Sequence, residues 1–124
     1  MPLVGIKRIY DPPSPEDGKR ILVDRLWPRG VKKEDARIDE WLKEIAPSDE
    51  LRRWFSHDPS RWEEFKRRYM KELEKKQDMV NRLRAEAKRV RVTLLFAARD
   101  TEFNNAVIVR EVIRGKIRLR GEWN

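Results

Sequence analysis

Apolar residues along the chain fall into runs and repeats that predict alternating strands and helices. Residues 5–10 predict a short strand. Residues 20–27 begin with a continuous apolar run, which is typical of a strand buried on both faces of a parallel sheet. Residues 91–98 form the clearest strand of the chain. Three prolines and a glycine between residues 11 and 18 predict an exposed connection between the first two strands.

Helical spacing fills the long segment between the second and third strands. The pattern predicts a helix over 38–45, and Ser48 as the N-cap of a short second helix. Asp58 is the expected N-cap of an apolar stripe that runs from 59 to 89. An unbroken helix of that length would measure about 45 Å. A domain of this size has a radius of gyration of only about 14 Å, so we expect a break near 75–78.

The end of the chain is predicted to add one more helix. Asp100 or Thr101 is the expected N-cap of a helix over 102–114, and Gly115 occupies its C-cap position. Residues 116–124 then form an edge strand or an ordered tail. These elements predict a single α/β domain over 1–124. It has a small, mostly parallel sheet, packed helices, and a helical insertion over about 38–89 between the main strands.

Composition narrows the classes of protein. With 39% hydrophobic residues, the chain holds enough apolar material for a core. It has no cysteine and one histidine, which excludes disulfides and thiolate metal sites and argues against a histidine-based one, so we expect no metal. No glycine-rich phosphate loop or dinucleotide fingerprint points to a cofactor. Because no apolar run reaches the length of a signal peptide or membrane span, we expect no membrane partner and a cytoplasmic location.

The balance of charge favours acidic partners. Charged residues make up 42% of the chain and the net charge is +8, which points first to nucleic acid. Much of this charge is expected to be paired on a helix face, because glutamate stands four residues before a cation at Glu63–Arg67, Glu64–Arg68 and Glu72–Lys76. We therefore expect nucleic-acid binding to be weak and non-specific. The abundance of Lys, Arg and Glu without cysteine also predicts a thermophilic origin.

Charged side chains follow two of the predicted strands, at the point where each strand ends. Asp24, Arg25 and Arg29 come after the second strand, and Arg99 and Asp100 after the third. The carboxyl ends of neighbouring parallel strands meet at one edge of a sheet, where ligands bind in open α/β folds. Arginine forks bind phosphate or carboxylate groups. The pattern predicts an anion pocket; the alternative is a structural network of Arg–Asp pairs that ties the strand ends together.

Further polar and aromatic residues near this edge have both a functional and a structural interpretation. Trp27 either stacks on a planar ligand or packs as a core residue under its loop. Asn104 and Asn105 either hydrogen-bond a ligand at the mouth of the last helix or cap that helix. His57 is either a general acid or base, or it is a helix cap or a group that supports the site without contacting the ligand. The candidate catalytic residues are Asp24, Asp100 and His57, and the candidate ligand-binding residues are Arg25, Trp27, Arg29, Arg99, Asn104 and Asn105.

Several strings of residues together resemble one known family. They are Asp24-Arg25-Leu26-Trp27-Pro28-Arg29-Gly30, Ala97-Ala98-Arg99-Asp100, His57-Asp58-Pro59 and Asn104-Asn105-Ala106. This set, which covers about residues 5–113, resembles the YeaO-like proteins of domain-of-unknown-function family 488. The resemblance implies no particular activity, because none is assigned to that family. Some of its members carry a transcriptional-regulator label, but the chain shows no helix-turn-helix with a basic recognition helix.

The sequence leaves three classes of function open. The first is a binding or enzymatic site for a small anionic ligand, such as a nucleotide or sugar phosphate, at the strand ends. The second is nucleic-acid binding through the basic surface, which would need many exposed cations rather than a few arginines in a pocket. The third is a non-catalytic interaction module, which would show a large exposed apolar patch. The sequence favours the first and does not determine the reaction or the oligomeric state.

Overall fold

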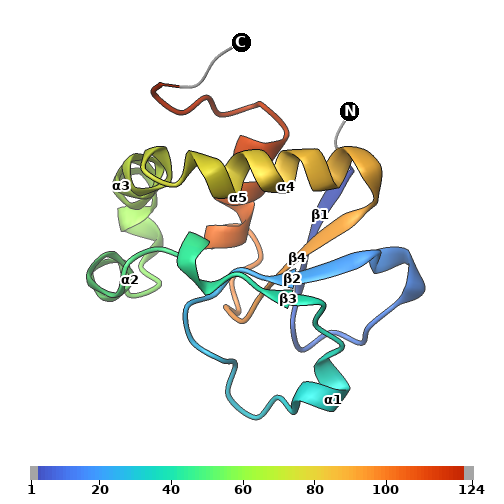
Figure 1. The fold of residues 1–124 in the computed structure, drawn as a ribbon. Helices are drawn as coiled ribbons and strands as arrows, with labels where there is room; N and C mark the ends of the chain where they lie inside the picture. Colours follow the sequence, from blue (N-terminus) through green and yellow to red (C-terminus); the bar gives the residue numbers. More distant parts are fainter. Residues whose placement is uncertain (1–2, 122–124) are drawn as a thin grey trace.

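Four parallel strands in the order β1-β4-β2-β3 form the sheet of the computed structural model, which describes residues 3–121 (Figure 1). The strands are β1 (Val4–Arg8), β2 (Lys19–Leu22), β3 (Glu40–Trp41) and β4 (Val92–Phe96). β4 lies between β1 and β2, and all five of its residues are buried. The predicted α/β fold with a parallel sheet is confirmed.

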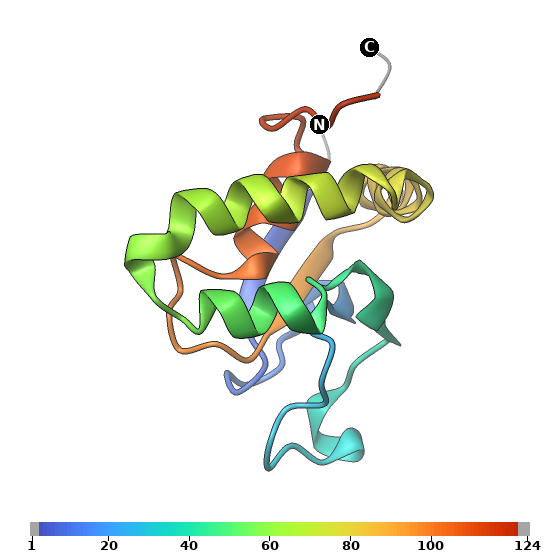
Figure 2. The ribbon, with the colours of Figure 1, turned by 90° about the vertical axis from the view of Figure 1, so that its left-hand side faces the viewer.

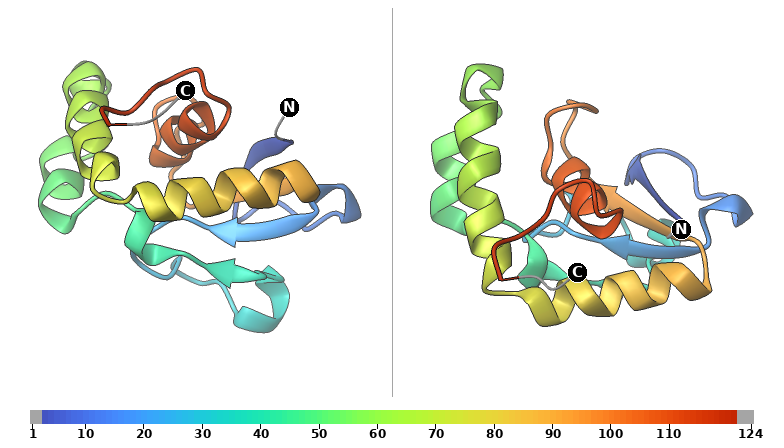
Figure 3. Two further views of the ribbon diagram at one scale, coloured as in Figure 1. Left: turned by 45° about the horizontal axis from the view of Figure 1, so that its top comes forward. Right: turned by 90° about the horizontal axis from the view of Figure 1, so that it is seen from above.

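Five α-helices surround this sheet. They are α1 (Lys33–Ala36), α2 (Asp49–Phe55), α3 (Trp62–Glu74), α4 (Gln77–Arg89) and α5 (Asn105–Ile113). Short 3-10 helices span Pro15–Asp17, Lys43–Ile45 and Pro59–Arg61. Helices α2 and α3 lie side by side (Figure 2). Helix α4 lies beside β2 and β3, and α5 packs on β1 and β4 (Figure 3).

The two faces of the sheet bury different sets of apolar side chains. Leu94 and Phe96 of β4 join the main core with residues of α2, α3, α4 and α5. Leu95, which points to the other face as expected for a strand, packs with Leu22 and with Ala36 of α1. The sheet therefore has four helices on one side and α1 with its flanking loops on the other.

The break in the long helical stripe falls where it was predicted. Lys75 and Lys76 separate the end of α3 from the start of α4, within the expected 75–78. Tyr69 of α3 is fully buried, and its hydroxyl donates a 2.7 Å hydrogen bond to the carbonyl oxygen of Ile45. The break lets α3 pack on α2 while α4 turns to the sheet.

The predicted helix over 38–45 is wrong. The backbone N–H of Asp39 donates to the carbonyl oxygen of Arg20, and that of Leu42 donates to Leu22, so the segment adds β3 to the edge of β2. Ile38 packs on the α1 side of the sheet and Leu42 in the main core. The spacing that resembled one helical stripe therefore serves two separate faces.

The last helix begins later than predicted. Asn104, not Asp100 or Thr101, is the N-cap of α5, because its side-chain oxygen accepts from the N–H of Val107 at 3.1 Å. Asp100 instead accepts from two N–H groups within the preceding turn, at 2.9 Å each. At the other end, Gly115 has φ +81 and completes the expected glycine C-terminus.

The chain after α5 is an ordered tail and not a strand, as far as it is described. Leu119 is only 1% exposed, the N–H of Arg120 donates to Glu74, and Gln77 donates to the carbonyl oxygen of Arg120. The rest of the predicted 116–124 segment, residues 122–124, lies outside the described residues.

Only one of the three predicted helix-surface ion pairs forms as predicted. Glu64 binds Arg68 at 2.7 Å, as predicted. Arg67 also binds Glu64, at 2.5 Å, and not the predicted Glu63. Glu72 accepts from the backbone N–H and hydroxyl of Ser48. Lys76 donates to carbonyl oxygens, including that of Ala46.

Two glycines with positive φ allow a matched test of this packing. Gly18 (φ +65) leads into β2, and a Cβ there would lie 2.3 Å from the carbonyl oxygen of Arg91, whereas a Cβ on Gly30 (φ +76) would meet nothing within 4 Å. We expect Gly30→Ala to cost about 1–2 kcal/mol for its left-handed backbone alone, and Gly18→Ala to cost clearly more. Thermal unfolding of both variants measures this; equal losses would contradict the close approach at Gly18.

Candidate functional site

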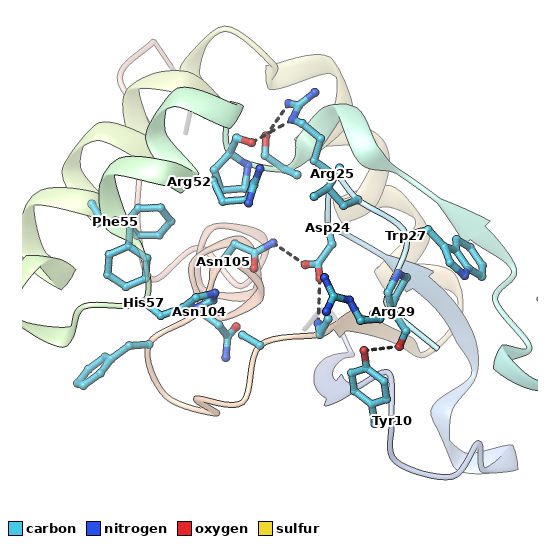
Figure 4. A pocket seen from close by; sticks show the side chains of 18 residues that line it. Tyr10, Asp24, Arg25, Trp27, Arg29, Arg52, Phe55, His57, Asn104 and Asn105 are labelled. Carbon is cyan, nitrogen blue, oxygen red and sulfur yellow. Dashed lines mark hydrogen bonds between the residues drawn. The ribbon is translucent and has the colours of Figure 1, made fainter. Parts of the chain in front are cut away.

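A cavity of about 460 Å³ lies beyond the C-terminal ends of β2 and β4 (Figure 4). Seven of the nine predicted site residues line it: Asp24, Arg25, Trp27, Arg29, His57, Asn104 and Asn105. The other two, Arg99 and Asp100, are not part of its wall. The strand ends therefore converge as the parallel topology requires, but the two charged residues in the turn after β4 do not line the cavity.

Asp24 stands at the centre of the wall and is held from behind. One carboxylate oxygen accepts from the backbone N–H of Ala97 at 2.9 Å, and the other from the side-chain amide of Asn105 at 3.3 Å. Burial raises the pKa of the Asp24 carboxyl above its ordinary 3.8, against the opposing effect of these two hydrogen bonds. The carboxyl thus joins the end of β4 to the start of α5 and still borders the cavity.

The two asparagines act mainly within the fold. Asn105 also donates to the carbonyl oxygen of Val23 at 2.8 Å, so one amide contacts both the residue after β2 and Asp24. Asn104 is 3% exposed; it caps α5 and donates to the carbonyl oxygen of Asp100 at 2.8 Å. The capping interpretation is therefore correct for Asn104, while Asn105 fixes the orientation of Asp24.

Three arginines reach the cavity from two elements. Arg25 donates to the carbonyl oxygens of Pro47 and Ala46, at 3.1 Å each, which fixes its guanidinium against the segment before α2. Arg29 is exposed at the rim, and its carbonyl oxygen accepts from the hydroxyl of Tyr10 at 2.9 Å. Arg52, on α2, is exposed and lines the same space. Arg52 was not among the predicted site residues, although it lies on the same side of α2 as Phe55, three residues later.

An Arg–Asp tie does not connect the strand ends. Arg25 bonds backbone carbonyls, Asp24 accepts from N–H groups, and Asp100 accepts from the backbone of its own turn. A buried Arg–Asp pair does exist elsewhere: Arg20 binds Asp17 at 2.6 Å at the start of β2. The cavity's charged residues are therefore not consumed by pairing with one another.

His57 is placed in the cavity wall by an unusual backbone. Ser56 (φ +47) and His57 (φ +55) are consecutive non-glycine residues in the left-handed region, each of which costs about 1–3 kcal/mol in general. Asp58, not His57, provides the cap of the next turn by accepting from the N–H of Ser60. The cap interpretation of His57 is therefore wrong, and its exposed ring lines the cavity.

Aromatic side chains form another part of the wall. Phe55 stacks on Phe65 with ring centroids 4.3 Å apart, and both are buried, while Phe103 is half-buried. Trp27 donates to the carbonyl oxygen of Val31 at 2.7 Å and packs edge-on against Trp41. Trp27 therefore supports its loop, as its structural interpretation predicts, while one side of it borders the cavity.

The described chain has neither a metal-binding cluster nor a membrane-spanning helix. Residues 3–121 hold no group of three or more His, Asp or Glu side chains suited to a metal ion. None of the helices in this range is both long and apolar enough to cross a bilayer.

Comparison with known proteins gives a family and several relatives. Residues 3–122 match the family described as the inactive DUF488-N3 subclade. The chain is 45% identical to the uncharacterized protein YeaO of Escherichia coli K12 over 111 residues, which are 90% of this chain and 96% of that protein. It is 39% identical over 113 residues to the uncharacterized proteins Mb3100c of Mycobacterium bovis and Rv3073c of Mycobacterium tuberculosis, covering 91% of this chain and 95% of each. No solved structure matches the chain.

Removal of Asp24 and removal of Arg29 should have different effects on stability. Asp24→Ala leaves the N–H of Ala97 without its acceptor and removes one of the two acceptors of the Asn105 amide, which costs about 1–3 kcal/mol. Arg29→Ala trims an exposed side chain at the rim and should keep the melting temperature within a few degrees. Thermal unfolding of both variants beside the parent measures this. If Arg29→Ala is as destabilising as Asp24→Ala, Arg29 belongs to the structural network and not to a ligand site.

Asp24 and Asp100 should show opposite pH dependence. Because burial raises the pKa of Asp24, the folded state retains this proton to higher pH than the unfolded chain. The stability of the parent relative to Asp24→Asn should therefore fall as pH rises from about 4 towards neutrality. The pKa of Asp100 is lowered by the N–H groups of Phe103 and Glu102. The stability of the parent relative to Asp100→Asn should therefore increase as pH rises. Unfolding curves at several pH values test this, and a parallel response would show that Asp24 is not the desolvated group.

Proposed function

This chain belongs to the inactive DUF488-N3 subclade, and we propose that its cavity binds a small anionic ligand, a phosphate or carboxylate compound, without converting it. The observation that carries the proposal is the arrival of Arg25, Arg29 and Arg52 at one cavity beyond the ends of parallel strands. Guanidinium groups bind such anions through paired N–H donors, and this edge of an α/β sheet is where ligands commonly bind.

The composition of the wall favours binding over covalent chemistry. Its eighteen residues include no cysteine, serine, threonine or lysine, the usual nucleophiles of covalent catalysis. Asp24, His57 and Tyr10 are the side chains in this wall that are able to move a proton. The description of the family as an inactive subclade supports the same conclusion.

Nucleic-acid binding through the basic surface is the weaker alternative. The net charge of +8 favours it. However, Arg67 and Arg68 both hydrogen-bond Glu64, whose pKa they lower to about 2, and Arg82 binds Glu40 at 2.6 Å. Cations paired in this way contribute less to a phosphate footprint, so we propose that any such binding is weak, non-specific and sensitive to salt.

Phosphate titration tests the proposed anion site. Inorganic phosphate added to ¹⁵N-labelled protein should shift the NMR signals of residues around the cavity. Arg52→Ala should weaken the apparent affinity about tenfold, the loss expected for one charge-assisted hydrogen bond. Arg53→Ala is the matched control, because Arg53 is an equally exposed neighbour on α2 outside the cavity wall, and it should have little effect.

Two results would contradict the proposal. Shifts confined to the basic surfaces of α3 and α4 would place the anion outside the cavity. Equal weakening of phosphate binding by Arg52→Ala and Arg53→Ala would show that the effect comes from general surface charge and not from the cavity.

A further inference from the structure

The cavity presents two different kinds of surface to a ligand. In Figure 4 the rings of Phe55 and His57 lie to one side of Asp24, and Arg29 and Tyr10 lie to the other. Phe103 is half-buried and the His57 ring is exposed, so ring surface remains accessible in the wall. A ligand that fills this space therefore needs a flat apolar part as well as an anionic part.

Asp24 adds a third requirement. Each of its oxygens accepts one hydrogen bond, from the backbone of Ala97 or from the side chain of Asn105. A carboxylate oxygen can accept more than one bond, so both oxygens keep acceptor capacity for a ligand. Because the two bonds come from different elements, they fix the plane of the carboxylate, which then offers two adjacent acceptors in a set orientation.

These surfaces restrict the ligand class. A carboxylate repels a nearby phosphate, so the part of the ligand next to Asp24 must carry hydrogen-bond donors while its anionic group contacts the arginines. A simple sugar phosphate supplies neither a flat ring nor paired N–H donors. A nucleotide supplies both, with its base and its phosphate at opposite ends.

Resting on the proposed anion site, we propose that the ligand is a nucleotide whose base directs two adjacent N–H donors at Asp24, the arrangement that guanine offers. The ring then lies against the aromatic side of the cavity near Phe103 and His57. The phosphate lies among Arg25, Arg29 and Arg52. A bidentate contact of this kind resembles the paired recognition that carboxylates make with forked donors elsewhere.

Binding to a panel of small probes tests this assignment on the intact protein. Isothermal titration should give tightest binding for guanosine monophosphate. Inosine monophosphate lacks one N–H donor and should bind about tenfold more weakly, as should ribose 5-phosphate, which lacks the ring. Xanthosine monophosphate, which replaces that donor with an acceptor, should also bind more weakly than guanosine monophosphate.

The substitution Asp24→Asn separates base recognition from a structural role. An amide offers one donor and one acceptor in place of two acceptors, so the preference between guanosine and xanthosine monophosphates should reverse. Asp100→Asn is the control, since Asp100 lies outside the cavity wall, and it should keep the parent's preference. A loss of stability alone would weaken both ligands equally and could not reverse their order.

Each outcome decides between the two proposals. If phosphate, ribose 5-phosphate and all the nucleotides bind equally in the cavity, the nucleotide assignment is overturned and the anion site stands. If none binds there, both fail. If Asp24→Asn does not fold, the parent's order among guanosine, inosine and xanthosine monophosphates still decides, and a preference for xanthosine monophosphate would overturn the assignment.

Discussion

One carboxyl group links three of the elements that border the cavity. Asp24 follows β2, accepts from the N–H of Ala97 after β4, and accepts from Asn105 at the start of α5. Asn105 in turn bonds the carbonyl oxygen of Val23. Burial of this carboxyl opposes its ionisation. The same bonds that close the sheet edge therefore orient the group that faces the cavity.

Local signals in the sequence predicted the parts of this arrangement that depend on neighbours in the chain. The buried run at Ile21 to Val23, the N-cap at Ser48 and the break after Lys75 are decided by apolar spacing and capping chemistry within a few residues. The parallel topology then followed, and with it the convergence of the strand ends. This convergence brought the loop that carries Asp24, Arg25 and Arg29 to the same cavity as Ala97 and Asn105.

Features that depend on distant partners were not predictable in the same way. β3 is only two residues long, and it forms because the edge of β2 supplies hydrogen-bond partners for its backbone. Its own sequence has helical spacing and therefore does not indicate a strand. The start of α5 was misplaced because Asp100 satisfies the N–H groups of its own turn, which leaves Asn104 as the cap. Arg52 was missed because an arginine on a short helix gives no local sign of which surface it faces.

Crystals of the protein soaked with phosphate offer the most direct test of the claim that this strand edge is an anion site. The account predicts tetrahedral electron density within the cavity, in hydrogen-bond contact with at least one of Arg25, Arg29 and Arg52. Density for phosphate only at surface lysines and arginines elsewhere, with the cavity filled by water, would contradict it.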